Sequence, residues 1–190
     1  RTLAIGVPPA DAVAAYTTVL KAHIGLARAL FPAGTTGQQL DAVTRAPLWA
    51  AKMDFAHGTG HGVGHVLSVH EGPVSVSKRG DKPLKPGMVL SNEPGFYQAG
   101  AWGIRIENLL AVRLADSRGN NAKDGFGGDA FLCFETLTRC PFDRRLIDPT
   151  KLDLAERDWV NAYHQTVKSA LTDDCSPAAR SWLEAACAPL

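Results

Sequence analysis

Hydrophobic residues recur every three to four positions over residues 9–31, a pattern that predicts an amphipathic helix. The apolar positions of this helix are Ala14, Val19, Leu20, Ile24, Ala27 and Leu30. Proline and glycine within residues 32–34 are expected to end it. A second helix is predicted from Thr36, because Gln39 follows at the spacing of a capping box. We expect Pro47 to interrupt this helix before a short helical continuation.

The middle of the chain changes from a helical to an extended pattern. Alternating residues over 66–71 predict a strand, and short strands are also predicted at 88–92 and 131–138. Residues 103–114 are rich in strand-forming residues. Residues 115–130 contain several glycines and charges, and we predict that they form an exposed hairpin loop.

The last part of the chain is again helical in pattern. Asp153 and Glu156 have the spacing of an N-terminal helix cap, and Ser176 followed by Pro177 is a typical helix start. The predicted order is helices, then strands joined by hairpins, then helices, without the strand–helix alternation of parallel sheets. We therefore predict an α+β fold with a mainly antiparallel sheet.

Composition narrows the class of protein. The chain has 190 residues, of which 45% are hydrophobic and 21% charged, so it can bury a core and is not a disordered chain. The 20 Lys and Arg nearly balance the 19 Asp and Glu, and the net charge of +1 argues against a nucleic-acid or polybasic membrane surface. No apolar run approaches the length of a membrane span. We therefore expect neither nucleic acid nor a membrane among its partners.

The four cysteines are Cys133, Cys140, Cys175 and Cys187, and none belongs to a C-x-x-C pair. A zinc knuckle is therefore not expected. We interpret these cysteines as small apolar residues of a protein in a reducing compartment. The disulfides Cys133–Cys140 and Cys175–Cys187 stay open as alternatives.

Residues 57–70 carry the most distinctive candidate chemistry. They include four histidines among several glycines: His57, His61, His65 and His70. Glycines let the backbone approach a ligand closely, and histidine is the commonest metal ligand. A phosphate loop is excluded, because no Lys-Ser/Thr pair and no helix follow the glycines. Together with Glu93 and Glu107, one of these imidazoles could form a mixed N/O site for a divalent ion.

Each of these residues also has a purely structural interpretation. Glu93 alone would be a solvated strand end. Glu107 alone would pair with Arg105 in a surface salt bridge, since the two share one face of a predicted strand. His23 and His164 lie on predicted helices and are interpreted as ordinary helix residues. Spacing alone therefore supports a metal hypothesis and identifies no substrate.

Three motifs, taken together, resemble the Xaa-Pro aminopeptidases of the aminopeptidase P group. They are residues 57–73 (HGTGHGVGHVLSVHEGP), 91–97 (SNEPGFY) and 103–108 (GIRIEN). Residues 134–138 and 143–148 also resemble the long-chain members of this group. The resemblance covers essentially the whole chain. It implies the pita-bread fold, with a curved, mainly antiparallel sheet and flanking helices, incomplete at its N-terminus.

The resemblance also implies a domain organisation and a dinuclear metal site. Residues 1–140 would form part of the catalytic domain, and residues 141–190 would be a helical extension packed on it. The family holds two divalent ions, commonly manganese, with two Asp, one His and two Glu; zinc and cobalt are alternatives. His61 matches the histidine ligand, Glu93 the first glutamate, and Glu107 the second glutamate, which bridges both metals.

The same resemblance implies the catalytic roles. A metal-bridging hydroxide would attack the bond between the first residue of a peptide and a following proline, with Glu93 as the proton shuttle. His57 and His70 would bind the substrate and stabilise the tetrahedral intermediate. Arg105 matches a positioning arginine beside the site. His65 is interpreted as a residue of the pocket wall and not as a ligand.

The resemblance places the two Asp ligands before Arg1. Arg1 and Thr2 resemble the end of the Thr-Arg-Thr segment that follows those ligands, whereas Asp11 and Asp41 lie on predicted helices. We expect the chain to be a fragment that supplies three of five ligands and is inactive alone. The implied partners are peptides with proline in second position, the missing N-terminal part, and a second copy in a cytoplasmic homodimer.

Two alternative functions stay open. A non-catalytic peptide- or protein-binding module on the same fold would use residues 141–190 for interaction. A hydrolase like prolidase or creatine amidinohydrolase would act on other small substrates, although the helical tail and residues 57–73 argue against it.

The apolar faces around Trp159 and Trp182 are either a dimer interface or part of the core.

Overall fold

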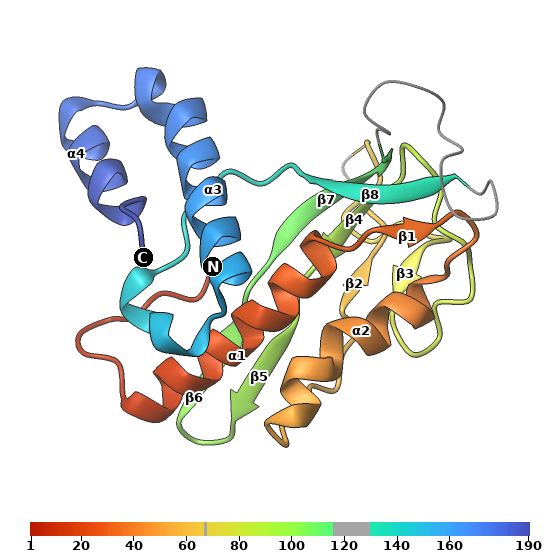
Figure 1. The fold of residues 1–190 in the computed structure, drawn as a ribbon, viewed down its shortest axis with the longest axis horizontal. Coiled ribbons are helices and arrows are strands. Elements are labelled where there is room, and N and C mark those ends of the chain that lie inside the picture. The colour runs from red at the N-terminus through yellow and green to blue at the C-terminus, as the bar shows by residue number, and fades with distance from the viewer. Residues whose placement is uncertain (67, 116–129) are drawn as a thin grey trace.

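The structure is a computed structural model that describes residues 1–66, 68–115 and 130–190. Figure 1 shows α1 and α2 lying across one side of the strands, with α3 and α4 at one end of the molecule. The helices are α1 (Ala10–Ala27), α2 (Gly37–Ala50), α3 (Leu154–Leu171) and α4 (Pro177–Ala186). Short 3-10 helices within the described stretches are η1 (Arg144–Leu146), η2 (Pro149–Lys151) and η3 (Thr172–Asp174).

The strands pair antiparallel throughout the described residues. Their bounds are β1 (Phe31–Pro32), β2 (Gly60–His61), β3 (Ser75–Val76), β4 (Val89–Asn92), β5 (Gly95–Gln98), β6 (Trp102–Arg105), β7 (Asn108–Leu114) and β8 (Phe131–Thr136). One sheet has the order β1-β8-β7-β4, and β2–β3 and β5–β6 form two-stranded ribbons. The predicted order of helices, strands and helices is confirmed, and with it the α+β class.

Two antiparallel ribbons meet end to end at one break. The β4–β7 ladder ends with the pair Asn92–Asn108, and the β5–β6 ladder begins with the pair Gly95–Arg105. The chain runs from β4 into β5 on one side of the break and from β6 into β7 on the other. Glu93 and Glu107 lie in the two short segments between the ladders, so the break brings them close together.

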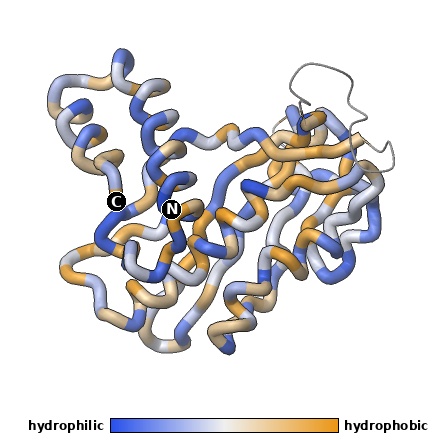
Figure 2. Tube along the Cα trace, viewed as in Figure 1, coloured by the Kyte–Doolittle hydropathy of each residue, from blue (hydrophilic) through white to orange (hydrophobic). Residues whose placement is uncertain are grey.

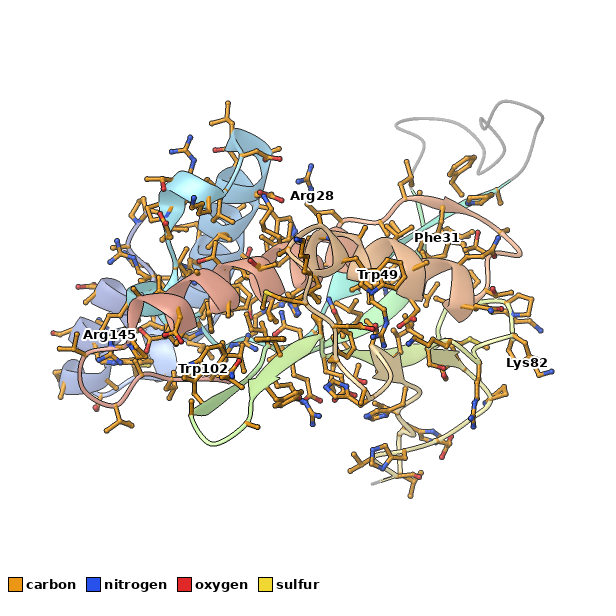
Figure 3. The ribbon with its side chains drawn as sticks, turned by 90° about the horizontal axis from the view of Figure 1, so that it is seen from below. Arg28, Phe31, Trp49, Lys82, Trp102 and Arg145 are labelled. Atoms are coloured by element: carbon orange, nitrogen blue, oxygen red, sulfur yellow. The ribbon has the colours of Figure 1, made fainter. Side chains whose placement is uncertain are left out.

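Two clusters of buried hydrophobic residues hold these elements together. The first joins α1, α3 and β6 and includes Leu20, Ile104 and Val160; the second joins α1 to the four-stranded sheet and includes Leu26, Leu90 and Leu110. Figure 2 shows hydrophobic residues repeating along α1 and along the strands of this sheet. Figure 3 labels one residue at each cluster: Trp102, which packs against the first, and Phe31, which belongs to the second.

The predicted helix starts are present, but one predicted break is wrong. At the start of α3, Glu156 Oε2 accepts from the Asp153 N–H at 2.9 Å, and Asp153 Oδ1 accepts from the Glu156 N–H at 2.8 Å. Before α2, Gln39 Oε1 accepts from the Thr36 N–H at 2.8 Å. Pro47 does not interrupt α2. It lies in the last turn, where it removes one hydrogen bond without ending the helix.

The strand predicted over residues 66–71 is also wrong. The described residues of this segment form bends within the long loop between β2 and β3, and Val66 and Val69 are exposed. The Glu71 N–H donates to the Gly62 carbonyl at 2.9 Å, so the loop closes on its own base. None of the described residues among 66–71 is buried, so the alternation does not mark a buried strand face there. The hairpin loop predicted for 115–130 lies, apart from its two end residues, outside the described residues.

The remaining fold predictions concern cysteines, membranes and domains. Cys140, Cys175 and Cys187 are free thiols, so neither disulfide left open by the sequence forms. In the described stretches no helix has the length and apolar character needed to cross a membrane. Residues of α3 and α4 share the first hydrophobic cluster with α1. The domain boundary at residue 140 stays a prediction.

Candidate metal centre

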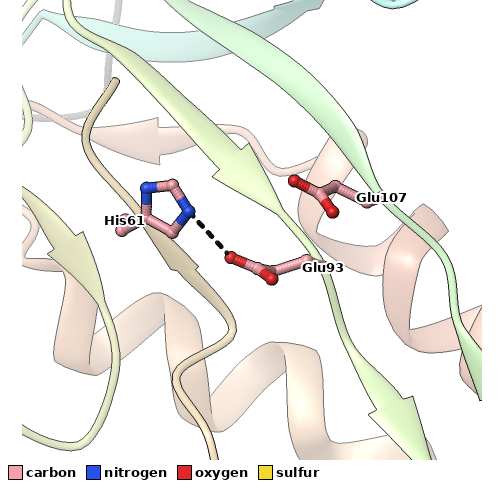
Figure 4. A group of neighbouring side chains, drawn as sticks. All are labelled: His61, Glu93 and Glu107. Atoms are coloured by element: carbon pink, nitrogen blue, oxygen red, sulfur yellow. Dashed lines mark ion pairs between the residues drawn. The ribbon is translucent and has the colours of Figure 1, made fainter. Parts of the chain in front are cut away.

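The three predicted metal ligands meet at one point of the structure. One ligand atom from each of His61, Glu93 and Glu107 lies within 4.8 Å of the other two. Figure 4 shows the three side chains converging from β2, from the segment after β4 and from the segment before β7. Among the described residues, this is the one group of three or more His, Cys, Asp and Glu side chains gathered closely enough to hold a metal ion.

Glycines on both sides of His61 allow β2 to pack tightly against its neighbours. A Cβ on Gly60 would lie 1.9 Å from the carbonyl oxygen of Ser91 in β4, and one on Gly62 would lie 2.0 Å from that of Glu71. Real Cβ atoms essentially never approach closer than 3.0 Å. The sequence suggested that these glycines admit a ligand. In the structure they admit neighbouring backbone, and this packing carries His61 to Glu93.

Ser91 connects the backbone of His61 to the carboxylate of Glu93. Its hydroxyl accepts from the His61 N–H at 2.9 Å and donates to Glu93 Oε1 at 2.9 Å. The Glu93 N–H donates to the Thr59 carbonyl at 2.7 Å. Because the residue is only 8% exposed and held at both ends, Glu93 is not the solvated strand end of the structural interpretation.

The hydrogen bond at Nδ1 of His61 favours a cation between the other ring nitrogen and Glu93. Nδ1 of His61 lies 3.0 Å from the Gly62 carbonyl, which can only accept, so Nδ1 carries the proton in the neutral ring. Nε2 is then an acceptor, and it faces Glu93 Oε1 at 3.2 Å. Two acceptors at this distance repel unless a proton or a metal ion lies between them. One imidazole and two carboxylates suit a hard or borderline divalent ion, so the residues present fit the metal that the resemblance implies.

Arg105 contacts Glu93 and not Glu107 in the ion pairs of the structure. Its Nη1 lies 3.6 Å from Glu93 Oε2, and the Arg105 side chain is 45% exposed. The predicted strand across residues 103–114 is interrupted, since β6 ends at Arg105 and β7 begins at Asn108. The expected shared strand face, and the surface pair between Arg105 and Glu107, are therefore wrong.

His57 lies at the end of a hydrogen-bonded chain that starts at Arg105. Arg105 Nε donates to the Tyr97 hydroxyl at 3.0 Å, and that hydroxyl lies 2.8 Å from His57 Nε2. His57 Nδ1 donates to the Gly58 carbonyl at 2.7 Å. Partial burial lowers the pKa of His57, and nearby Arg105 lowers it further, while the Gly58 carbonyl acts in the opposite direction. A neutral His57 therefore accepts from Tyr97, a residue to which the sequence analysis gave no role.

The other two histidines of the motif lie differently. The His70 ring centroid is 4.2 Å from that of His61, so His70 borders the candidate centre. His65 is exposed and is not part of the three-residue group of candidate ligands. This agrees with the expectation that His65 is not a ligand, and its place in the pocket wall stays a prediction.

An open cavity of about 440 Å³ lies beside the centre. It is lined by Arg1, Thr2, Tyr97, Gly103, Arg105 and Glu107. Thr2 is held against β6, since its hydroxyl accepts from the Arg105 N–H at 3.0 Å and donates to the Arg105 carbonyl at 3.1 Å. The first residues of the chain therefore form part of the site together with β6.

Comparison with known proteins identifies the family. Residues 1–113 match the profile of metallopeptidase family M24, and residues 130–190 match the C-terminal region of peptidase M24. The chain belongs to metallopeptidase family M24. The first match contains all the candidate site residues, and the second contains α3 and α4.

Individual relatives narrow the position within family M24. A protein named Probable Xaa-Pro aminopeptidase P from Sclerotinia sclerotiorum is 45% identical over 195 residues, covering 100% of this chain and 32% of the relative. The X-prolyl aminopeptidase from Caenorhabditis elegans, described as a cytosolic enzyme with a di-nuclear active site, has a TM-score of 0.89 and 39% identity, covering 100% of this chain and 31% of its own. The resemblance to Xaa-Pro aminopeptidases and to the pita-bread fold is confirmed.

A dipeptidase of the same fold matches less of the chain. The Xaa-Pro dipeptidase from Bacillus anthracis has a TM-score of 0.59 and 33% identity, covering 75% of this chain. This chain spans about one third of the length of each relative that it matches along its whole length. The activity, substrates and partners of the whole protein are therefore matters of proposal.

Proposed function

We propose that the protein containing this chain is a dinuclear metallo-aminopeptidase that hydrolyses the bond between an N-terminal residue and a following proline. One observation carries the proposal. His61, Glu93 and Glu107 place ligand atoms within 4.8 Å of one another in a chain that matches an X-prolyl aminopeptidase along its whole length. Neither the grouping nor the likeness alone would identify a peptidase with this specificity.

His61, Glu93 and Glu107 would hold two divalent ions, with Mn²⁺ as the proposed metal and Zn²⁺ or Co²⁺ as alternatives. We place the two aspartates of the implied ligand set outside these 190 residues. When bound, such ions polarise a carbonyl and make water nucleophilic at neutral pH. The mixed N/O donor set of this chain suits all three metals, so metal identity depends on measurement.

The remaining side chains act on the substrate and on its proton. Glu93, whose carboxylate Ser91 holds in one orientation, would carry the proton from the nucleophile to the leaving proline nitrogen, because an oriented carboxylate can accept and then return a proton. His57 and His70 would bind the substrate and the developing negative charge, and His57, whose Nε2 accepts from Tyr97 in the neutral ring, would do so once Nε2 carries a proton. Arg105 would position Tyr97 and, through it, His57.

The test uses the natural protein that contains these residues, stripped of metal and then loaded with Mn²⁺. We expect release of the first residue from Gly-Pro-Ala and longer Xaa-Pro peptides, none from Gly-Ala-Ala, and loss of release with chelator. Cleavage of Gly-Pro alone would support a dipeptidase instead, and binding without cleavage would support the non-catalytic module. The matched variant His61→Gln should lose both metal and activity, and retention of both would contradict the proposal.

We also propose a cytoplasmic homodimer. Trp182 is 61% exposed on α4, whereas Trp159 is partly buried and stacks on Tyr163 with ring centroids 5.5 Å apart, so Trp182 is the more accessible of the two to a second copy. The mass of the natural protein in solution tests this, with Trp182→Ser expected to shift a dimer toward the monomer. A monomeric wild-type protein would overturn the dimer without affecting the proposed chemistry.

A further inference from the structure

Arg1 binds the backbone on which Glu107 lies. Its Nη1 donates to the Glu107 carbonyl, and its Nη2 donates to Asn108 Oδ1 at 2.5 Å. The same Nη2 lies 2.8 Å from the Cys140 carbonyl and 2.8 Å from the Tyr163 hydroxyl. One guanidinium therefore ties the candidate ligand segment to the segment that leads into η1 and to α3.

The contacts of Arg1 are hydrogen bonds to neutral groups and not ion pairs. In the described part of the chain, no carboxylate is ion-paired with Arg1, and its donors go to neutral oxygens. A guanidinium offers five N–H donors in a rigid plane, which a lysine ammonium does not. Such a fork fixes several acceptors relative to one another at once. Those acceptors include the carbonyl of a candidate metal ligand.

Two further residues fix the partners of Arg1. The Tyr163 hydroxyl, which accepts from Arg1, lies 2.8 Å from the Cys140 carbonyl and can donate to it. Asn108 is fully buried, and its Nδ2 donates to His23 Nε2 at 3.1 Å. The other ring nitrogen of His23, Nδ1, donates to the Ile106 carbonyl at 3.2 Å. Both residues that flank Glu107 are therefore hydrogen-bonded to one histidine of α1.

His23 also reaches the segment of Glu93. Its backbone carbonyl accepts from Asn92 Nδ2 at 2.9 Å, and Asn92 is the cross-strand partner of Asn108. Asn92, which precedes Glu93, and Asn108, which follows Glu107, are thus both hydrogen-bonded to the buried His23. The sequence analysis interpreted His23 as an ordinary helix residue. Its contacts instead place it directly behind the break that carries both glutamates.

We propose that Arg1 is a positioning residue that sets Glu107 for metal binding, and that Tyr163 of α3 and His23 of α1 hold Arg1 and Asn108 in place for this task. The inference rests on the proposed function, since it concerns the same metal centre. Groups that orient metal ligands change metal affinity when they are removed, even though they never touch the ion. The helical C-terminal region is, on this view, part of the support of the centre.

The competing interpretation is that these hydrogen bonds only stabilise the fold. A control on the same helix separates the two. Val167 lies one turn after Tyr163 on α3, is fully buried and belongs to the first hydrophobic cluster, so Val167→Ala weakens packing of α3 without removing a polar contact. Tyr163→Phe removes only the hydroxyl and keeps the ring that packs there.

The experiment titrates Mn²⁺ into the metal-free natural protein by calorimetry and measures Tm without metal. We expect Arg1→Lys to weaken Mn²⁺ binding roughly tenfold, the lower end of the effects known for groups behind metal ligands, and Tyr163→Phe to weaken it by a smaller factor, because Tyr163 acts through Arg1. Val167→Ala should lower Tm and leave Mn²⁺ affinity unchanged. Tyr163→Phe keeps the test valid even where Arg1→Lys does not fold.

Two results would overturn the positioning role. One is unchanged Mn²⁺ affinity in Tyr163→Phe and in folded Arg1→Lys. The other is that Val167→Ala loses as much Mn²⁺ affinity as Tyr163→Phe and Arg1→Lys do when their Tm values fall by the same amount. Failure of the proposed function is distinguishable, because it would show in the wild-type protein as absent Mn²⁺ binding or absent Xaa-Pro cleavage. Absent wild-type binding would overturn both proposals, and absent cleavage with intact binding would overturn only the function.

Discussion

Gly60→Ala is the single methyl addition that most directly tests how β2 delivers His61 to the centre. The new Cβ would lie 1.9 Å from the Ser91 carbonyl oxygen and 3.4 Å from its hydroxyl. Both contacts are with β4, which cannot retreat, because on its other side it is paired with β7 in the four-stranded sheet. The strand that carries His61 must therefore move instead.

The size of this movement follows from the contact itself. To bring the Cβ to 3.0 Å, the shortest separation that real Cβ atoms show, β2 must shift by about 1 Å. A shift of about 1 Å in a catalytic group costs roughly 100-fold in rate. It would also break the 2.9 Å bond from the His61 N–H to Ser91, which aligns the carboxylate of Glu93. We expect kcat/KM to fall about 100-fold and overpacking to cost about 1–3 kcal/mol of stability.

The assay measures kcat/KM on a Xaa-Pro peptide, Mn²⁺ affinity and Tm in the natural protein. Gly25→Ala is the matched control, because a Cβ there meets nothing within 4 Å and the residue lies inside α1. That variant should keep full activity and gain about 0.5–1 kcal/mol of stability, since alanine is the better helix former. Full activity and unchanged Mn²⁺ affinity in Gly60→Ala would refute the packing argument.

Three further changes have separate expected outcomes. Tyr97→Phe should lower kcat/KM about tenfold with little change in Tm, because it removes one charge-assisted hydrogen bond from Arg105 and the donor to His57; an unchanged rate would exclude Tyr97 from the site. Asp153→Ala should cost about 1 kcal/mol in thermal unfolding through loss of the α3 cap and leave metal affinity intact. Burial lowers the pKa of His164 from 6.5 to about 4, so the unfolded chain takes up this proton first. The contribution of His164 to the free energy of unfolding should be constant above pH 6.5 and fall by up to about 3 kcal/mol toward pH 4, as measured by urea unfolding. An equal fall in the His164→Gln variant would contradict this prediction.

The sequence carried the fold class and the candidate ligands because both depend on local patterns. Helix starts such as that at Asp153 are written in residues three positions apart, and the structure forms the expected hydrogen bonds. The motifs that contain His61, Glu93 and Glu107 are each short and contiguous. What the sequence could not show was that one break in the strand pairing joins them, since that depends on the register between distant segments.

Tyr97 was missed although a signal for it was present. The β5–β6 hairpin pairs Tyr97 with Gly103 and Gly95 with Arg105. Residues two apart on one strand share a face, so Tyr97 lies diagonal to Arg105 on the same face of the ribbon. Counting back from the turn between these strands would have placed the hydroxyl beside the guanidinium. The alternation over residues 66–71 misled in the opposite way, because a pattern of period two indicates a strand only where one face is buried.

The position of the centre follows from how antiparallel ladders end. Where two ladders break at the same place, the backbone groups between them lose their strand partners and must find others. Here the Glu93 N–H finds the Thr59 carbonyl, which lies in the segment that carries His61, and the Glu107 carbonyl finds Arg1. The break that contains Glu93 and Glu107 therefore also leaves two of their backbone groups free to bind other segments. The Glu93 N–H binds the segment of His61, and the Glu107 carbonyl binds the Arg1 guanidinium. The break thus adds the Glu93–Thr59 bond to the contacts with Val89 and Ser91 that already hold the His61 segment against β4.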